Sequence, residues 1–195
     1  MAYQTYTTRA LVVASMEGVA ADRTIVLFTR DAGLVHARAV SVRKETSKLR
    51  YGLQDFSLLT VSLIRGRQGW RVVGAERCYN LYFTSDDRAV RGALLRTVRL
   101  LRRLIRGEEA VPEVYDALIE GLESITECEG VDVLRAERTL VLRLLAALGY
   151  IASSSVYAHL LEASSVRDVL ALPVVHGEES ATRAAIDRAL AFSHL

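Results

Sequence analysis

The stretch SKLRYGLQDFSLLTVSLIRGRQGWRVVGAE (residues 47–76) decides the fold that we expect for this chain. A polar connection leads into an apolar run at residues 56–64, a turn follows at residues 65–69, and a second run covers residues 70–77. Two such runs around a glycine-containing turn predict a β-hairpin. Between residues 38 and 71, eight basic side chains stand against two acidic ones. These basic residues are Arg38, Arg43, Lys44, Lys48, Arg50, Arg65, Arg67 and Arg71. A small β domain with such a cluster is typical of a protein that binds a polyanion.

Three further strands are expected before this stretch, at residues 3–14, 24–29 and 34–42. Short β-rich runs separated by turn residues such as DAG (residues 31–33) favour a compact antiparallel domain. Five strands with one longer basic connection, at residues 43–55, predict a small Greek-key barrel of the OB type. Strand count alone leaves an SH3-like barrel open as the alternative.

From residue 86 onward the pattern turns helical. Leu94, Val98, Leu101 and Ile105 recur at helical spacing within residues 88–106 and form one apolar stripe. Further helices are expected at residues 112–128, 132–148, 154–163, 165–170 and 180–192. The chain is therefore predicted to be an α+β protein of two domains. These are an N-terminal OB-fold barrel (residues 1–80), which would bind DNA, and an all-helical domain (residues 81–195).

The net charge of +2 hides an uneven distribution. Residues 1–82 carry a net charge of +6 and residues 84–106 a net charge of +5, whereas residues 107–137 carry −9. Segregation of this kind predicts one surface for nucleic acid and another that faces away from it or toward a basic partner. No apolar run approaches the ~18 residues of a membrane span. The first residues lack the apolar core of a signal peptide, so we expect a cytoplasmic, nucleoid-associated protein without membrane contact.

The sequence shows no catalytic constellation. The four histidines are scattered without metal-ligand spacing, and Cys78 and Cys128 are too few for a cysteine-based zinc site or a disulfide framework. Phosphate-binding, dinucleotide-binding and nucleophile-elbow motifs are lacking. We therefore expect a protein that is not an enzyme and that needs no cofactor or metal.

Three stretches resemble one known family, the bacterial recombination mediator RecO. They are LFTRDAGLVHARAVSVRK (residues 27–44), the opening stretch at residues 47–76, and RTLVLRLLAALGY (residues 138–150). The C-terminal TRAAIDRALAFSHL (residues 182–195) fits the last helix of the family. Many members carry a four-cysteine zinc module after the LGY motif, but residues 151–182 hold no cysteine, so no zinc site is carried over.

The resemblance implies an OB fold followed by a helical domain, and binding to single- and double-stranded DNA. It also implies annealing of complementary strands and partnership with RecR. Contact with the C-terminal tail of the single-strand-binding protein is implied as well, so that RecA can load onto DNA.

Three groups of residues are predicted to do this work. The eight basic residues of the barrel region would contact phosphates, with Tyr51 and Trp70 as candidates for base stacking or, for Trp70, for the barrel core. Arg96, Arg99 and Arg103 would extend the DNA contacts along the first helix, or else form a solvated helix face. By the resemblance, Arg138 would receive the acidic tail beside an apolar groove lined by Leu142, Leu144 and Leu145, unless Arg138 pairs with Glu137 or Asp132.

Two alternative functions stay open. The chain would be an adaptor with weak, RecR-dependent DNA binding, or an RNA-binding OB-fold protein of another pathway. The salt dependence of DNA binding and the preference for DNA over RNA separate these possibilities, because they report phosphate contacts and the 2′-hydroxyl respectively.

Overall fold

The computed structural model describes residues 4–18, 20–45, 47 and 49–192. The chain divides into two compact units. One unit takes Met1–Thr84 and Ile105–Pro112, and the other takes Ser85–Leu104 and Glu113–Leu195. The chain therefore leaves the first unit, builds one helix of the second, and returns before it leaves again.

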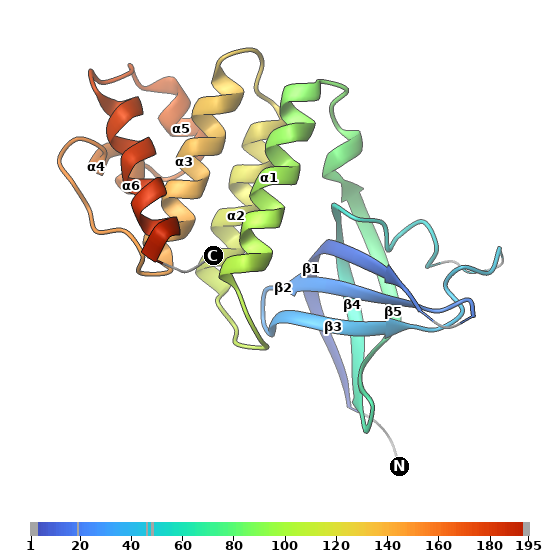
Figure 1. Ribbon diagram of the computed structural model, residues 1–195. Coiled ribbons are helices and arrows are strands. Elements are labelled where there is room, and N and C mark those ends of the chain that lie inside the picture. The colour runs from blue at the N-terminus through green and yellow to red at the C-terminus, as the bar shows by residue number, and fades with distance from the viewer. Residues whose placement is uncertain (1–3, 19, 46, 48, 193–195) are drawn as a thin grey trace. The chain divides into compact units, whose positions relative to one another are not determined.

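The first unit is a closed β-barrel (Figure 1). Its described strands are β1 (Thr5–Glu17), β2 (Arg23–Thr29), β3 (Gly33–Ala39), β4 (Ser57–Gly66) and β5 (Gly69–Asn80). Their order around the barrel is β1-β2-β3-β5-β4, with β4 pairing back to β1. Every neighbouring pair is antiparallel except β3 and β5, which run parallel. This order is that of an OB fold, so the predicted fold class is confirmed and the SH3-like alternative is wrong.

The barrel closes around inward-facing aliphatic side chains from all five strands. Alternate residues of β3, Val35, Ala37 and Ala39, are fully buried, whereas His36 and Arg38 between them are exposed. Leu53 from the β3–β4 connection closes the same core. Full burial of a Val or Leu side chain contributes about 1.5–3 kcal/mol, so this interior holds the outward-facing polar residues at fixed positions.

The β1 strand continues to Glu17, past the end at residue 14 that the sequence suggested, and residue 3 of the predicted strand lies outside the described residues. Strand β1 pairs with β2 as far as Glu17 and with β4 from Thr5, so both of its ends are held by a neighbour. A register shift between Val12 and Ala14 bends the strand where it passes from one partner to the other. Such pairing across the barrel has no local signature in the sequence.

Residues 105–112 pack against the β2–β3 turn of the barrel. The backbone N–H of Leu34 donates to the carbonyl oxygen of Gly107 at 2.9 Å. Gly33 has a φ of 62°, and a Cβ atom there would lie 2.2 Å from the carbonyl oxygen of Glu109. Only glycine combines this left-handed backbone with so close an approach. The returning segment is thus part of the barrel unit.

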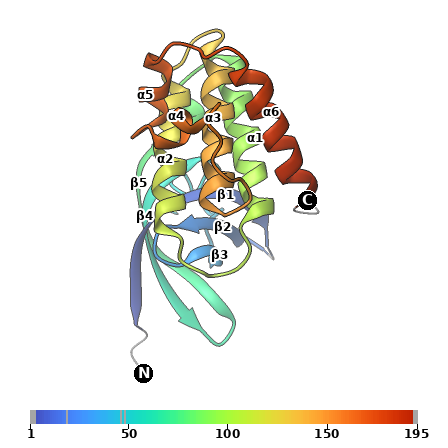
Figure 2. The same ribbon diagram turned by 90° about the vertical axis from the view of Figure 1, so that its left-hand side faces the viewer.

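The second unit is helical. A 3-10 helix at Leu81–Phe83 precedes it. Its described helices are α1 (Arg88–Leu104), α2 (Pro112–Thr126), α3 (Asp132–Ala147), α4 (Ala158–Glu162), α5 (Val166–Ala171) and α6 (Glu178–Phe192). Figure 1 shows α3 between α6 and α1, and α3 also contacts α4 and α5. Figure 2 shows the same helices from the side on which α4 and α6 lie in Figure 1. A Cβ atom on Gly121 of α2 would lie 2.4 Å from Leu140 Cδ1 of α3, so this glycine lets the two helices approach closely.

Candidate nucleic-acid interface

The seam between β3 and β5 places two arginines side by side on the outside of the barrel. The Cα atoms of Ala37 and Trp70 are partners across this seam, and so are those of Arg38 and Arg71. Because side chains alternate between the two faces of a strand, Ala37 and Trp70 point inward and the two arginines point outward. Arg38 and Arg71 therefore present two guanidinium groups from adjacent strands.

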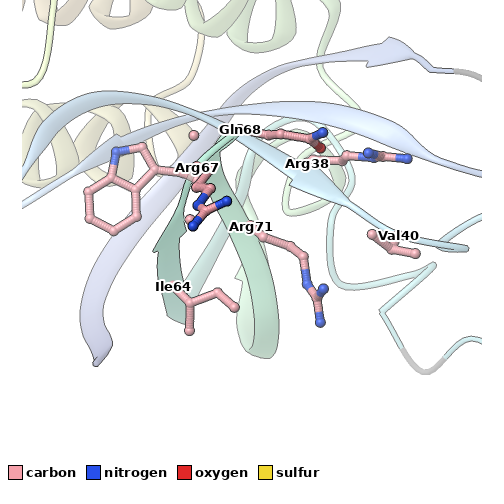
Figure 3. Close-up of a pocket in the computed structure, with 9 residues that line it drawn as sticks. Arg38, Val40, Ile64, Arg67, Gln68 and Arg71 are labelled. Atoms are coloured by element: carbon pink, nitrogen blue, oxygen red, sulfur yellow. The ribbon is translucent and has the colours of Figure 1, made fainter. Parts of the chain in front are cut away.

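These arginines border a pocket of about 520 Å³, which we call the seam pocket. Its lining residues are Arg38, Val40, Ile64, Gly66, Arg67, Gln68, Gly69, Trp70 and Arg71. Figure 3 shows the labelled side chains of Arg38, Arg67 and Arg71 gathered around this hollow, with Val40 and Ile64 at its apolar wall. Cations, an amide and apolar surface in one hollow suit a phosphate with its attached sugar and base.

Trp70 forms the inner wall of the seam pocket. Its ring meets the Tyr6 ring edge-on, with centroids 5.4 Å apart, and the Arg65 guanidinium carbon lies 5.4 Å from its centroid. The side chain is buried, and its Nε1 has no hydrogen-bond partner among the described residues. Arg65 also pairs with Glu108 at 3.4 Å. Trp70 thus packs as part of the barrel wall.

Asp22 holds Arg38 in place. Its Oδ2 accepts from Arg38 Nε at 2.8 Å, and its Oδ1 accepts from the backbone N–H of Ser41 at 2.7 Å. The bond from Ser41, followed by that from Arg38, lowers the pKa of the Asp22 carboxyl below its ordinary value. Ser41 has a φ of 53°, so this bond also secures a left-handed turn at the end of β3. The Asp22 carboxylate therefore fixes the position of the Arg38 guanidinium and partly neutralises its charge.

We expect Asp22→Asn to lower the melting temperature of the protein at neutral pH. The amide loses the charged bond to Arg38, and the strained turn at Ser41 loses its carboxylate acceptor. Because the native pKa is lowered, this stabilisation is complete above the ordinary carboxyl pKa and is lost as the pH falls through the native value. Melting curves of both proteins across a pH series measure this, and a difference that persists unchanged into acid would contradict it.

The predicted residues of the β3–β4 connection form a second group. Arg43 pairs with Glu17 at 3.3 Å, Lys44 is exposed, and the Arg50 guanidinium carbon lies 5.8 Å from the centroid of the Tyr51 ring. Lys48 lies outside the described residues. Arg23, at the start of β2, borders the same hollow as Arg43 and Arg50. Sequence reasoning missed Arg23 because it lies twenty residues before the basic connection, and only the barrel brings them together.

The arginines of α1 divide into two kinds. Arg96 donates to both carboxylate oxygens of Glu137 on α3, with Nε–Oε1 and Nη2–Oε2 distances of 2.7 and 2.6 Å. The bond to Glu137 raises the pKa of Arg96 above its ordinary value. Arg96 thus links α1 to α3, which limits its availability for DNA. Arg99 and Arg103 are exposed, as a DNA contact requires.

The residues predicted for the protein-tail site lie differently from the expected groove. Arg138 forms an ion pair with Glu179 of α6, not with Glu137 or Asp132. Leu142 and Leu145 are fully buried, and so is Leu144. Because Leu142 packs with Leu160 and Val169 in the helical core, these leucines form the interior and not an open wall. The exposed apolar side chains of this unit include Val174 and Val175, which line a hollow beside Glu179.

A buried ionic cluster organises the start of α6. Glu178 Oε1 accepts from Arg135 Nε at 3.1 Å, and Glu178 Oε2 lies 3.0 Å from His159 Nε2. Burial alone would raise the pKa of the Glu178 carboxyl, but bonds from Arg135, His159 and the N–H of Val175 lower it below its ordinary value. Hydrophilic residues far apart in sequence give no sign that they will be buried together.

Within the described ranges, no three His, Cys, Asp or Glu side chains are grouped to hold a metal ion. Across the same residues, none of the helices has the length and hydropathy that crossing a membrane requires.

Comparison with known proteins gives a consistent result for both units. Residues 1–75 match the family described as Recombination protein O N terminal, and residues 88–169 match Recombination protein O C terminal. A protein of Myxococcus xanthus named DNA repair protein RecO is 31% identical over 116 residues, which cover 59% of this chain and 47% of that protein. A protein of the same name from Dehalococcoides mccartyi is 30% identical over 120 residues, which cover 62% and 47% respectively. The chain spans about half the length of these curated relatives. With an OB-type barrel under the first match and a helical unit under the second, this chain belongs to the RecO family.

Proposed function

We propose that this chain is a DNA-binding mediator of recombinational DNA repair and acts without covalent chemistry. The observation that supports this most directly is the seam pocket, where Arg38, Arg67 and Arg71 surround one hollow on an OB-type barrel. A guanidinium group can donate two parallel hydrogen bonds to the oxygens of one phosphate, and its binding releases counterions from the DNA. OB folds commonly bind single strands across such a surface.

The proposed mechanism assigns different tasks to residues 1–80 and 81–195. The barrel binds single- and double-stranded DNA by the backbone, which neutralises two strands and allows complementary bases to anneal. The helical part receives the C-terminal tail of the single-strand-binding protein through Arg138, and RecR binds the barrel. Together these contacts would let RecA load onto DNA. The family membership and the relatives' name support a role in DNA repair.

One observation favours a second candidate, an adaptor with weak intrinsic DNA binding. Several predicted contact residues already have carboxylate partners, as Arg38 has Asp22, Arg43 has Glu17 and Arg65 has Glu108. Each of these pairs must be exchanged for a phosphate when DNA binds, which lowers the net gain. An adaptor would then need RecR to complete the DNA site.

The experiment that tests the proposal is fluorescence anisotropy of a labelled single-stranded oligonucleotide across a salt series. We expect direct binding. The logarithm of the association constant should fall linearly with the logarithm of the salt concentration, with a slope of roughly −0.7 for each phosphate contacted. An RNA of the same sequence serves as the comparison and should bind no more tightly. Lack of binding at low salt would favour the adaptor, and a clear preference for RNA would favour an RNA-binding protein.

A further inference from the structure

A second hollow lies on the barrel, and it shares no lining residue with the seam pocket. It has a volume of about 300 Å³ and is lined by Arg23, Arg43, Arg50, Tyr51 and Gln54. We call it the arginine pocket. Arg23 comes from the start of β2 and the other four residues come from the β3–β4 connection, so the folded barrel is needed to build it.

Hydrogen bonds to backbone carbonyl oxygens hold the walls of the arginine pocket. The N–H of Arg43 donates to the carbonyl oxygen of Ala21 at 3.0 Å, which fastens the connection to the β1–β2 turn beside Arg23. On the other wall, the N–H of Leu53 donates to Leu49 O at 3.1 Å. Arg77 Nη1 of β5 donates to Tyr51 O at 3.5 Å. The pocket is therefore formed before any ligand arrives.

The charges in the arginine pocket are unbalanced. Three guanidinium groups line it, and the acidic partner is Glu17, which lies 3.3 Å from Arg43 and is 75% exposed. Within the described part of the chain, Arg23 and Arg50 form no ion pair with a carboxylate. Positive charges that are held close together repel one another, and a bound anion relieves this repulsion. The excess of positive charge thus selects a ligand that carries about two negative charges.

The size of the arginine pocket and its other two side chains limit further which ligands fit it. A volume of about 300 Å³ lies at the small end of ligand pockets, which suits one nucleotide better than a continuous strand. Tyr51 offers an aromatic ring, and Gln54 offers an amide that both donates and accepts. A phosphomonoester carries roughly −1.5 to −2 charges near neutral pH and three acceptor oxygens, whereas a phosphodiester inside a strand carries a single charge.

We propose that the arginine pocket binds the phosphomonoester at the end of a DNA strand. Arg23, Arg43 and Arg50 bind the phosphate oxygens, and the terminal nucleoside lies against Tyr51 and Gln54. This inference rests on the proposed DNA-binding function and adds to it, because internal phosphates bound at the seam pocket carry no information about strand ends. The same chemistry occurs at a 5′ end, at a 3′ end and in a free nucleotide, and the tests below separate these sources.

The first test uses mononucleotides and does not depend on binding to longer DNA. Melting temperatures are measured with thymidine 5′-monophosphate, thymidine 3′-monophosphate, thymidine and inorganic phosphate. We expect one or both monophosphates to raise the melting temperature more than thymidine or phosphate alone, and Arg50→Gln to abolish the difference. Inorganic phosphate that stabilises as strongly as the nucleotides would overturn the nucleotide assignment. Equal melting temperatures in all four solutions would overturn the site.

The second test compares oligonucleotides of one sequence with a 5′-phosphate, a 3′-phosphate or hydroxyl groups at both ends. We expect one phosphorylated form to bind about tenfold more tightly than the hydroxyl form, which is the effect of a charge-assisted hydrogen bond to a group of this kind. The double variant Arg23→Gln/Arg50→Gln should remove this preference. Arg50→Gln alone serves if the double variant fails to fold, because Arg50 is exposed.

The control Arg183→Gln removes one charge, as Arg50→Gln does, from an exposed site on α6 and should preserve the preference. If all three oligonucleotides bind equally, the strand-end inference fails while DNA binding stands. If none binds although the mononucleotides stabilise the protein, the pocket stands and the DNA-binding function fails.

Discussion

Glu178→Gln is expected to destabilise the protein by about 3–5 kcal/mol, the usual cost of removing one partner from a buried ion pair. Glu178 and Arg135 have side chains that are 3% and 9% exposed. The variant leaves the Arg135 guanidinium buried, with its bond to the carbonyl oxygen of Leu172 but without a counter-ion. His159 loses its contact with the same carboxylate. The free energy of unfolding from chemical denaturation measures the loss.

The adjacent Glu179 provides a matched control for this prediction. It makes the same kind of pair, with Arg138, but its side chain is 64% exposed. Because exposed pairs contribute about 0–1 kcal/mol, Glu179→Gln should change stability little. Similar losses in the two variants would mean that burial of the pair is not what matters.

The same cluster predicts a dependence on pH. The native pKa of Glu178 is lowered, so its stabilising contribution is complete above the ordinary carboxyl pKa and is lost as the pH falls through the native value. The stability difference between the wild type and Glu178→Gln should therefore narrow in acid.

The double variant Arg67→Ala/Arg71→Ala is expected to weaken binding of single-stranded DNA roughly tenfold or more near physiological salt. The salt slope should become shallower by about 1.4, since each phosphate contact with a single strand contributes roughly 0.7. Both arginines are exposed at the seam pocket, and no carboxylate pairs with either one among the described residues. Their loss therefore removes cations without breaking an internal ion pair. Fluorescence anisotropy across a salt series measures both quantities.

The variant Arg183→Ala/Arg188→Ala removes the same charge from exposed positions of α6. It should leave the slope unchanged if the seam pocket contacts the phosphates. If the two variants weaken binding equally, net charge and not the seam pocket governs the affinity. Melting temperatures of both variants show whether the fold is retained.

Sequence reasoning reached the fold because the barrel and the helices have local signatures. The short runs at residues 56–64 and 70–77 and the turn between them predicted β4 and β5, and the apolar stripe from Leu94 to Leu101 predicted α1. The ends of the strands were harder to predict from the sequence. The strand β5 continues to Asn80, whose side-chain amide donates to Asp55 O and Ser57 Oγ, and that pairing joins residues more than twenty positions apart.

The candidate sites were predicted less completely, because a list of basic residues does not show which of them are already paired. Arg38 and Arg96 carried the same expectation as Arg71 and Arg99, but Asp22 and Glu137 partly neutralise the first two. Neither carboxylate is near its arginine in sequence. The apolar periodicity around Leu142 likewise marked a buried face correctly, and a buried face cannot also serve as an open groove.

The parallel seam between β3 and β5 couples DNA binding to the stability of the barrel. Two residue pairs join β3 to β5, whereas ten pairs join β4 to β5, so the barrel has its shortest pairing at the place where Arg38 and Arg71 stand abreast. A phosphate held by both guanidiniums spans the two strands and adds a tie across that joint. Because a ligand that binds only one state of an equilibrium stabilises that state, DNA bound at the seam would stabilise the closed barrel. A change that weakens the pairing of β3 with β5 would then also weaken DNA binding.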